Sequence, residues 1–512
     1  MFNKVLIANR GEIALRIIRA CREMGVKSVA VFSDADAASP HVREADEAVN
    51  VGPAPSTESY LRGDRIVEVA LDRGAEAIHP GYGFLSEREW FARSVRAAGL
   101  SFVGPPAEAI AAMGSKTAAR TLAVASGVPV VPGTTEALRD ADAACRIASQ
   151  FGYPVLLKAA AGGGGKGMRV VTEESGMEAA LESARREAKN AFGDDAVYVE
   201  KYIDGPRHVE IQVLADMHGN VLSLGERECS VQRRHQKMLE EAPSVAVSGD
   251  LRREMGETAV RMARAAGYVN AGTCEFLLDR DGKFYFLEMN TRLQVEHPVT
   301  ELVTGIDLVQ WQLRIAAGEI LPFAQADLTP RGWAIECRIT SEDTANGFLP
   351  STGRIDYLHV PGGPGVRWDS GIETGSVVGL NYDPMLAKLI VWAETRELAI
   401  GRMHRALLEL TIDGVETSRD FHLRLMEDEE FRRGDIDIQW LERRLPQMTG
   451  ALPPARSVRS AAIAAALFAE RDRGGGPLPN GGAMPDPSAA RADGHLANND
   501  GWMRAGRLEG LR

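Results

Sequence analysis

In the first 113 residues, short apolar runs alternate with stretches whose apolar positions recur every three or four residues. The runs at 4–8, 29–32 and 75–79 are typical of buried strands, and 11–24 has the pattern of an amphipathic helix. Alternation of this kind predicts a parallel sheet with helices on its faces. The turn after the first run does not match G-x-G-x-x-G, so it gives no support for dinucleotide binding.

Residues 114 to about 204 predict a separate small unit, in which two strand patterns enclose the glycine-rich segment 160–167. Four consecutive glycines let backbone N–H groups approach an anion closely, and Lys158 and Lys166 add positive charge. The segment is not a Walker A loop, because glycine rather than serine or threonine follows Lys166. We interpret it as a lid that contacts phosphate, with a plain hairpin tip as the alternative.

Segment 273–288 predicts a β-hairpin, since Asp281-Gly282 is a strong two-residue turn signal between strand-forming runs. Counting outward from a loop of those two residues sets Glu275 opposite Glu288. Facing side chains have Cβ atoms about 4.5–5.5 Å apart, so the two carboxylates repel each other. A divalent cation removes that repulsion, and oxygen ligands suit Mg²⁺ or Mn²⁺. A solvated, charged outer face is the alternative for this pair taken alone.

The stretch 286–298 extends the second strand and places polar side chains at every even position from 288 to 296. An extended strand points all of them to one face. They are Glu288, Asn290, Arg292, Gln294 and Glu296. Such a face makes a poor core, and it predicts a site that holds a metal ion, an anion and a base together.

Two further segments carry polar patterns. Residues 207–214 alternate so that His208, Glu210 and Gln212 share one strand face. Residues 227–237 form a dense cationic patch without aromatic residues, which favours a small anionic substrate over nucleic acid.

The part after residue 333 is rich in strand patterns with glycine and proline turns. Strands are predicted at 334–339, 353–359 and 385–392, and a helix at 397–410. Arg338 shares a strand face with Glu336, for which a solvated face is the alternative interpretation. Beyond residue 446 the sequence predicts an alanine-rich helix at 457–473 and a Gly/Pro-rich linker at 474–487.

Composition narrows the class of protein. The 512 residues allow roughly three to four domains. A net charge of −12 argues against nucleic acid or an anionic membrane as the partner. No apolar run approaches the ~20 residues of a membrane span, and the N-terminus lacks the pattern of a signal peptide. The five cysteines are scattered without a CxxC pair, which suits a reducing cytoplasm.

Five strings of residues together resemble the biotin carboxylase family of ATP-grasp enzymes, from residue 1 to about 446. They are Leu6–Ala14, His79–Glu87, Lys158–Met168, Val231–Lys237 and Glu288–Pro298. The resemblance implies a multidomain α/β and α+β fold. Its expected parts are a parallel α/β domain (1–113), an ATP-grasp domain (114–330) with a mobile lid at about 130–204, a mixed C-terminal domain (331–446) and a tail (447–512).

The resemblance also implies roles for residues by position. ATP phosphates and ribose are expected at Lys116, Lys158, Gly164, Gly165, His208 and His235, with Gln232 also in the cofactor site. Adenine is expected at Glu200, Lys201, Tyr202 and Ile203. The Mg²⁺ or Mn²⁺ ligands are expected to be Glu275, Glu288 and Asn290. Bicarbonate is expected at Lys237, Arg292, Gln294 and Val295. Glu296 matches the base, and Arg338 matches the residue that faces the ureido oxygen of biotin.

The activity implied is carboxylation of biotin by ATP and bicarbonate through carboxyphosphate, the first half-reaction of an acetyl-CoA or propionyl-CoA carboxylase. The sequence has no Ala-Met-Lys-Met string, so we expect the biotin on a separate biotin carboxyl carrier protein. The other expected partners are a second copy of the chain and a carboxyltransferase subunit. One alternative is another ATP-grasp carboxylate ligase, against which Arg292-Leu-Gln-Val-Glu296 argues. The other is a regulatory protein that binds ATP without catalysis, which would be expected to lack a metal carboxylate or the base.

Overall fold

The computed structural model describes residues 1–134, 137–159, 168–449 and 463–466. The chain divides into two units, Met1–Gly450 and Ala451–Arg512. In the second unit the described residues 463–466 are helical, and the predicted linker at 474–487 lies outside the described residues. No helix in the described part of the chain is both long and apolar enough to span a membrane.

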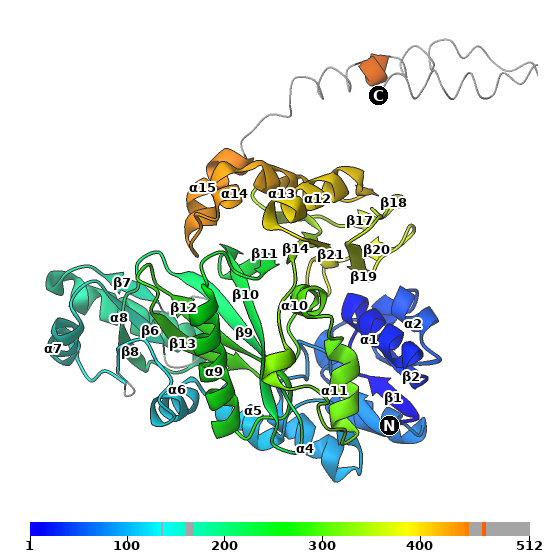
Figure 1. The fold of residues 1–512 in the computed structure, drawn as a ribbon, viewed down its shortest axis with the longest axis horizontal. Helices are drawn as coiled ribbons and strands as arrows, with labels where there is room; N and C mark the ends of the chain where they lie inside the picture. The colour runs from blue at the N-terminus through cyan, green and yellow to red at the C-terminus, as the bar shows by residue number, and fades with distance from the viewer. Residues whose placement is uncertain (135–136, 160–167, 450–462, 467–512) are drawn as a thin grey trace, which may run out of the picture. The chain divides into compact units, whose positions relative to one another are not determined.

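The N-terminal part is the predicted parallel α/β structure (Figure 1). Five parallel strands lie in the order β3-β2-β1-β4-β5. Their bounds are β1 Lys4–Ile7, β2 Lys27–Ser33, β3 Glu47–Gly52, β4 Ala77–His79 and β5 Ser101–Phe102. The main helices are α1 Gly11–Glu23, α2 Pro40–Glu44, α3 Gly63–Asp72, α4 Glu89–Ala97 and α5 Ala107–Gly114. Strand β3 was not predicted, because most of its residues are only half-buried and its apolar signal is weak.

A second, smaller sheet carries the strands on both sides of the glycine-rich segment. Its order is β7-β6-β8, and both pairings are antiparallel. The strands are β6 Val155–Ala159, β7 Arg169–Val171 and β8 Val197–Lys201, and the helices of this part are α6 Lys116–Ala125, α7 Ala141–Phe151 and α8 Met177–Phe192. Both strands predicted around the segment are therefore present, and residues 160–167 themselves lie outside the described residues.

The site is built on one large antiparallel sheet of eight strands, ordered β13-β12-β9-β10-β11-β14-β21-β19. The strands are β9 Arg207–Ala215, β10 Val221–Arg233, β11 Gln236–Ala242, β12 Asn270–Leu278, β13 Phe284–Asn290, β14 Trp333–Thr340, β19 Val366–Ser370 and β21 Met385–Ala393. Helices α9 Gly249–Ala265, α10 His297–Thr304 and α11 Leu308–Ala316 complete this part. The pairing of β11 with β14 joins the expected ATP-grasp and C-terminal parts in a single sheet.

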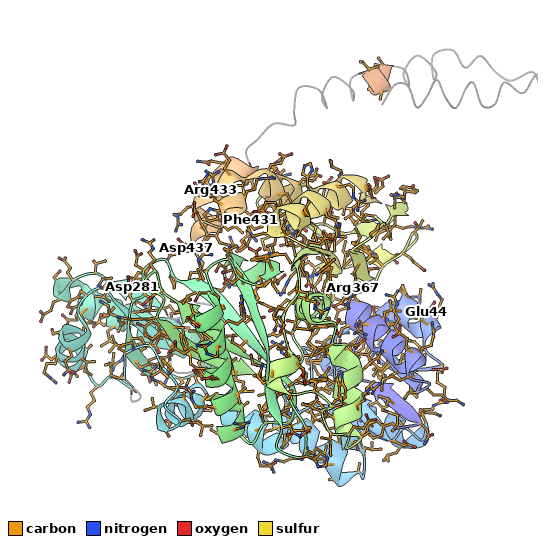
Figure 2. All side chains as sticks on the ribbon, viewed as in Figure 1. Glu44, Asp281, Arg367, Phe431, Arg433 and Asp437 are labelled. Atoms are coloured by element: carbon orange, nitrogen blue, oxygen red, sulfur yellow. The ribbon has the colours of Figure 1, made fainter. Side chains whose placement is uncertain are left out.

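Helices follow in the last part of the first unit. They are α12 Arg396–Glu409, α13 Arg419–Glu427, α14 Glu429–Arg433 and α15 Trp440–Thr449, and Phe431 (Figure 2) and Trp440 lie in their core. The single strand predicted at 353–359 is wrong. It is two short strands, β17 Gly353–Arg354 and β18 Tyr357–His359, because each pairs with a different partner, β20 Val377–Val378 and β22 Thr411–Asp413.

Candidate active site

The hairpin of β12 and β13 sets Glu275 opposite Glu288, as the sequence predicts. The turn of the hairpin is longer than the two-residue loop that we expected. Residues Asp279 to Lys283 form the turn, with Asp281 near its tip (Figure 2), which shifts the register by one residue. A β-bulge at Leu287 then adds one residue to β13 and restores the facing pair.

The polar face predicted for residues 288–296 is not one continuous strand. Strand β13 ends at Asn290, and the chain turns before α10 begins at His297. The predicted side chains still converge. The Arg292 guanidinium donates to Asn290 Oδ1 at 3.0 Å and to Gln294 Oε1 at 2.9 Å. The Asn290 amide nitrogen donates to Glu275 Oε1 at 2.9 Å. The turn therefore brings together polar side chains that an extended strand would have kept farther apart.

Lys237, on β11, lies among three carboxylates. Its Nζ is 2.6 Å from Glu210, 3.0 Å from Glu275 and 2.6 Å from Glu296. Burial opposes ionisation of Glu296, yet the positive charges of Lys237 and Arg338 outweigh it and hold the pKa of this carboxyl well below its ordinary value. Glu296 is therefore ionised in the structure.

Arg227 was predicted only as part of a cationic patch that favours a small anionic substrate. Its side chain is fully buried and is paired with Glu210. Its Nε donates to Glu210 at 2.5 Å and its Nη1 to Gln212 at 2.7 Å. The alternation of residues 207–214 could have pointed to the position of Arg227. It puts three polar side chains on one strand face, and if that face is buried they need a hydrogen-bonding partner.

Arg338, on β14, reaches Glu296 from the other side. Its Nη2 donates to Glu296 Oε2 at 2.9 Å, and its Nε donates to Glu240 Oε1 at 2.6 Å. The solvated face considered for Arg338 and Glu336 is wrong, because Glu336 is fully buried and the Arg338 side chain is only 18% exposed. Glu240 was not predicted as part of the site.

A cavity of about 650 Å³ lies between the small sheet and the hairpin β12–β13. Nine predicted site residues line it: Lys116, Lys158, Glu200, Tyr202, His208, Gln232, His235, Glu275 and Glu288. Of the other residues predicted for ATP, Lys201 and Ile203 are not among the described residues that line it, and Gly164 and Gly165 lie outside the described residues.

Arg120 is a cavity residue that sequence reasoning missed. Its Nη1 donates to Glu200 Oε1 at 3.2 Å, while Lys158 Nζ lies 2.5 Å from the other oxygen of the same carboxylate. Two cations therefore hold Glu200 at the cavity wall. No motif marked Arg120, because its helix α6 is brought to β8 only by the fold.

The donor set at the hairpin fits a divalent metal ion. Glu288 opens onto the cavity, where desolvation together with the facing Glu275 raises the pKa of its carboxyl. Two carboxylates and an amide oxygen, from Glu275, Glu288 and Asn290, are hard ligands of the kind that Mg²⁺ prefers. The nearby Glu210 is held by the buried Arg227 as well as by Lys237, whereas Glu275 shares Lys237 with it.

We expect Glu288→Gln to weaken Mg²⁺-dependent turnover by about 10²-fold, the scale of losing one preorganised charge. The measurement is ATP hydrolysis across a Mg²⁺ titration. Asp281→Asn is the matched control, because it removes an exposed carboxylate from the turn of the same hairpin, outside the cavity lining. Equal activity of the Glu288 variant at limiting Mg²⁺ would exclude this ligand role.

A nucleotide-sized cavity between two antiparallel sheets, with paired glutamates and lysines in its wall, defines an ATP-grasp enzyme. Three family models match the chain. Residues 115–324 match the ATP-binding domain of the carbamoyl-phosphate synthase L chain, 1–110 match the biotin carboxylase N-terminal domain, and 336–443 match the biotin carboxylase C-terminal domain. The chain belongs to the biotin carboxylase family.

Relatives agree with this assignment. The chain is 52% identical over 446 residues to the biotin carboxylase of Haemophilus influenzae, covering 87% of this chain and 99% of the relative. It is 47% identical over 489 residues to the propionyl-CoA carboxylase alpha chain of Ruegeria pomeroyi, covering 91% and 72%. A solved structure, the biotin carboxylase domain dimer of Hydrogenobacter thermophilus 2-oxoglutarate carboxylase with MgADP, ADP and bicarbonate, matches with a TM-score of 0.83 at 47% identity, covering 88% of this chain and all of that one.

Proposed function

We propose that this chain uses ATP and bicarbonate to carboxylate biotin through carboxyphosphate. The observation that carries the proposal is the placement of Glu296, an ionised buried carboxylate between Lys237 and Arg338, next to the wall of the nucleotide cavity. The likeness to a domain solved with MgADP and bicarbonate supports the same ligands here.

The cavity residues account for the nucleotide. The candidates for the ATP phosphates are Lys116, Lys158, His208 and His235. The candidates for the adenine ring are Tyr202 and Glu200. A divalent ion held by Glu275, Glu288 and Asn290 would neutralise charge that develops on the transferring phosphoryl group. The protein's own contribution is to position the phosphates and to supply positive charge in a site shielded from water.

Bicarbonate fits beside Arg292, Lys237 and Gln294. A bound anion draws Lys237 toward itself, so part of the positive charge that now lowers the pKa of Glu296 is shared with the anion. The pKa of Glu296 then rises, and the carboxylate becomes a better base for the bicarbonate proton. The deprotonated oxygen attacks the γ-phosphorus, the bond to ADP breaks, and carboxyphosphate forms.

Arg338 serves the second step. Carboxyphosphate breaks down to CO₂ and phosphate, the phosphate removes the N1 proton of biotin, and N1 bonds to the CO₂ carbon. Negative charge develops on the ureido oxygen of biotin as N1 loses its proton. A guanidinium that already reaches Glu296 is placed to hold that charge.

The partners follow from the reaction. We infer that biotin arrives on a separate carrier protein and that a carboxyltransferase subunit passes the carboxyl group onward. Relatives named for pyruvate and for propionyl-CoA both match most of this chain, which supports an acceptor selected outside it. The dimer named for the Hydrogenobacter domain supports a homodimer here.

The test is a pair of assays on the purified chain: ATP hydrolysis with and without bicarbonate, and transfer of ¹⁴C from bicarbonate to free biotin. We expect hydrolysis to require bicarbonate and the label to appear on biotin. ATP hydrolysis that ignores bicarbonate but responds to an amine would favour another carboxylate ligase. A chain that binds ATP without turnover would favour a regulatory protein.

A further inference from the structure

Two buried glutamates face each other behind Arg338. Glu240 on β11 and Glu336 on β14 are directly opposite in the antiparallel pairing, and both side chains are fully buried. Opposite residues have Cβ atoms about 4.5–5.5 Å apart and point to the same face of the sheet. Two ionised carboxylates at this separation, away from water, repel each other strongly.

Their hydrogen bonding is incomplete. Among the described residues, both oxygens of Glu336 and Oε2 of Glu240 have no hydrogen-bond partner. The remaining oxygen, Glu240 Oε1, accepts from Arg338. Buried polar atoms are nearly always paired, so three unpaired oxygens on two facing carboxyl groups require an explanation. One proton between the two groups pairs two of these three oxygens, because a protonated carboxyl donates to its neighbour, and it also removes one of the two facing charges.

The surrounding charges do not offer Glu336 a different partner. On β21, Lys388 directs its ammonium to the Val295 carbonyl at 2.9 Å and to Glu12 of α1 at 3.3 Å. On α10, Glu301 is paired with Arg16 and with Arg367 of β19 (Figure 2), and His297 is neutral because burial and the cations around it hold its pKa well below the ordinary value. The other charged groups that face the pair are Arg338 on β14, Lys237 on β11 and Glu296.

We propose that Glu336 keeps a proton in the resting enzyme and donates a hydrogen bond through it to the Glu240 carboxylate. This bond weakens the interaction of Glu240 with Arg338, which makes Glu336 a positioning residue for carboxyl transfer. With one negative charge on the pair, the Arg338 guanidinium shares its hydrogen bonds between Glu240 and Glu296 and can release them to bind the ureido oxygen of biotin. With two negative charges, Glu240 holds the guanidinium back. The role of Arg338 in this proposal rests on the proposed function.

The pKa values of both carboxyl groups are raised, which agrees with a proton held between them. Burial raises the pKa of Glu336 well above its ordinary value, and burial raises the pKa of Glu240 to about 7 against the opposing charge of Arg338. A carboxyl whose pKa is raised on folding binds more protons in the folded state. Its contribution to the free energy of unfolding is therefore fully present below the unfolded pKa and is lost as the pH rises through the folded pKa.

The first test needs no turnover. In infrared difference spectra of wild type against Glu336→Gln at neutral pH, we expect the variant to lose the carbonyl stretch of an un-ionised carboxylic acid. Glu241→Gln is the matched control, because Glu241 is the next residue of β11, is equally buried, and is paired with Arg396 at 2.7 Å and 3.0 Å. It should lose no such band. Unfolding free energies of wild type should fall more steeply toward alkaline pH than those of Glu336→Gln.

The second test is the pH profile of carboxyl transfer to free biotin. The Glu336→Gln amide donates permanently, so we expect its alkaline limb to lie about one pH unit or more above that of wild type. Glu336→Asp, which keeps a titratable group, should restore a limb close to that of wild type.

Two outcomes would overturn the proposal: no loss of the infrared band in Glu336→Gln, or pH profiles of wild type and Glu336→Gln that superimpose. If Glu336→Gln does not fold, infrared difference spectra of wild type at neutral and alkaline pH replace it, and the carboxylic acid band should be lost as the pH rises. An inactive wild type with the band present would contradict the proposed function instead.

Discussion

Replacing Glu296 by glutamine is expected to lower bicarbonate-dependent ATP hydrolysis by about 10²–10⁴-fold, the usual range for losing a general base. The amide keeps the shape of the side chain but cannot take a proton. It also leaves Lys237 and Arg338 without the carboxylate that they contact at 2.6 and 2.9 Å. The measurement is kcat for ADP release at saturating bicarbonate.

A folding control separates chemistry from stability in this variant. Glu226→Gln removes another buried glutamate of the large sheet, which is paired with Arg252 at 2.7 Å outside the cavity lining. It should leave the rate close to that of wild type while costing stability, as loss of a buried pair does. A Glu296 variant that folds like wild type and hydrolyses ATP at the same rate would show that the base is another group.

The sequence predicted the facing pair Glu275–Glu288 for a reason that was only partly right. Turn residues and strand alternation are local signals, and they identify the hairpin correctly. The loop length and the bulge at Leu287 depend on how the hairpin packs, and no local pattern marks them. The two differences cancel, so the pair is where the count placed it.

What the sequence could not show is contact between distant strands. Glu240 meets Arg338 and Glu336 only because β11 pairs with β14, and Glu240 and Arg338 are 98 positions apart in the chain. Arg227 was grouped with a cationic patch for an anionic substrate, because local composition does not reveal that it is buried against Glu210. The parallel α/β part was predictable, since its strands and helices alternate along the chain and each signal is local.

Replacing Arg338 by glutamine is expected to reduce transfer of ¹⁴C from bicarbonate to free biotin by about 10²–10³-fold, the scale of one charge aimed at a developing oxyanion. Bicarbonate-dependent ATP hydrolysis should fall less, because Lys237 and Arg292 remain beside the other predicted ligands of bicarbonate. The measurement compares the two rates in one preparation, so that any loss of folded protein affects both equally.

The comparison with Arg338→Lys sharpens the interpretation. Lysine keeps the positive charge but cannot contact Glu240 and Glu296 through separate nitrogens of one planar group, as Arg338 does at 2.6 and 2.9 Å. It should therefore recover part of the transfer rate and not all of it. Equal losses of both activities in Arg338→Gln would place this residue in the bicarbonate site or in the local fold. A larger loss of transfer would support its role at the ureido oxygen, because only that step creates charge on biotin.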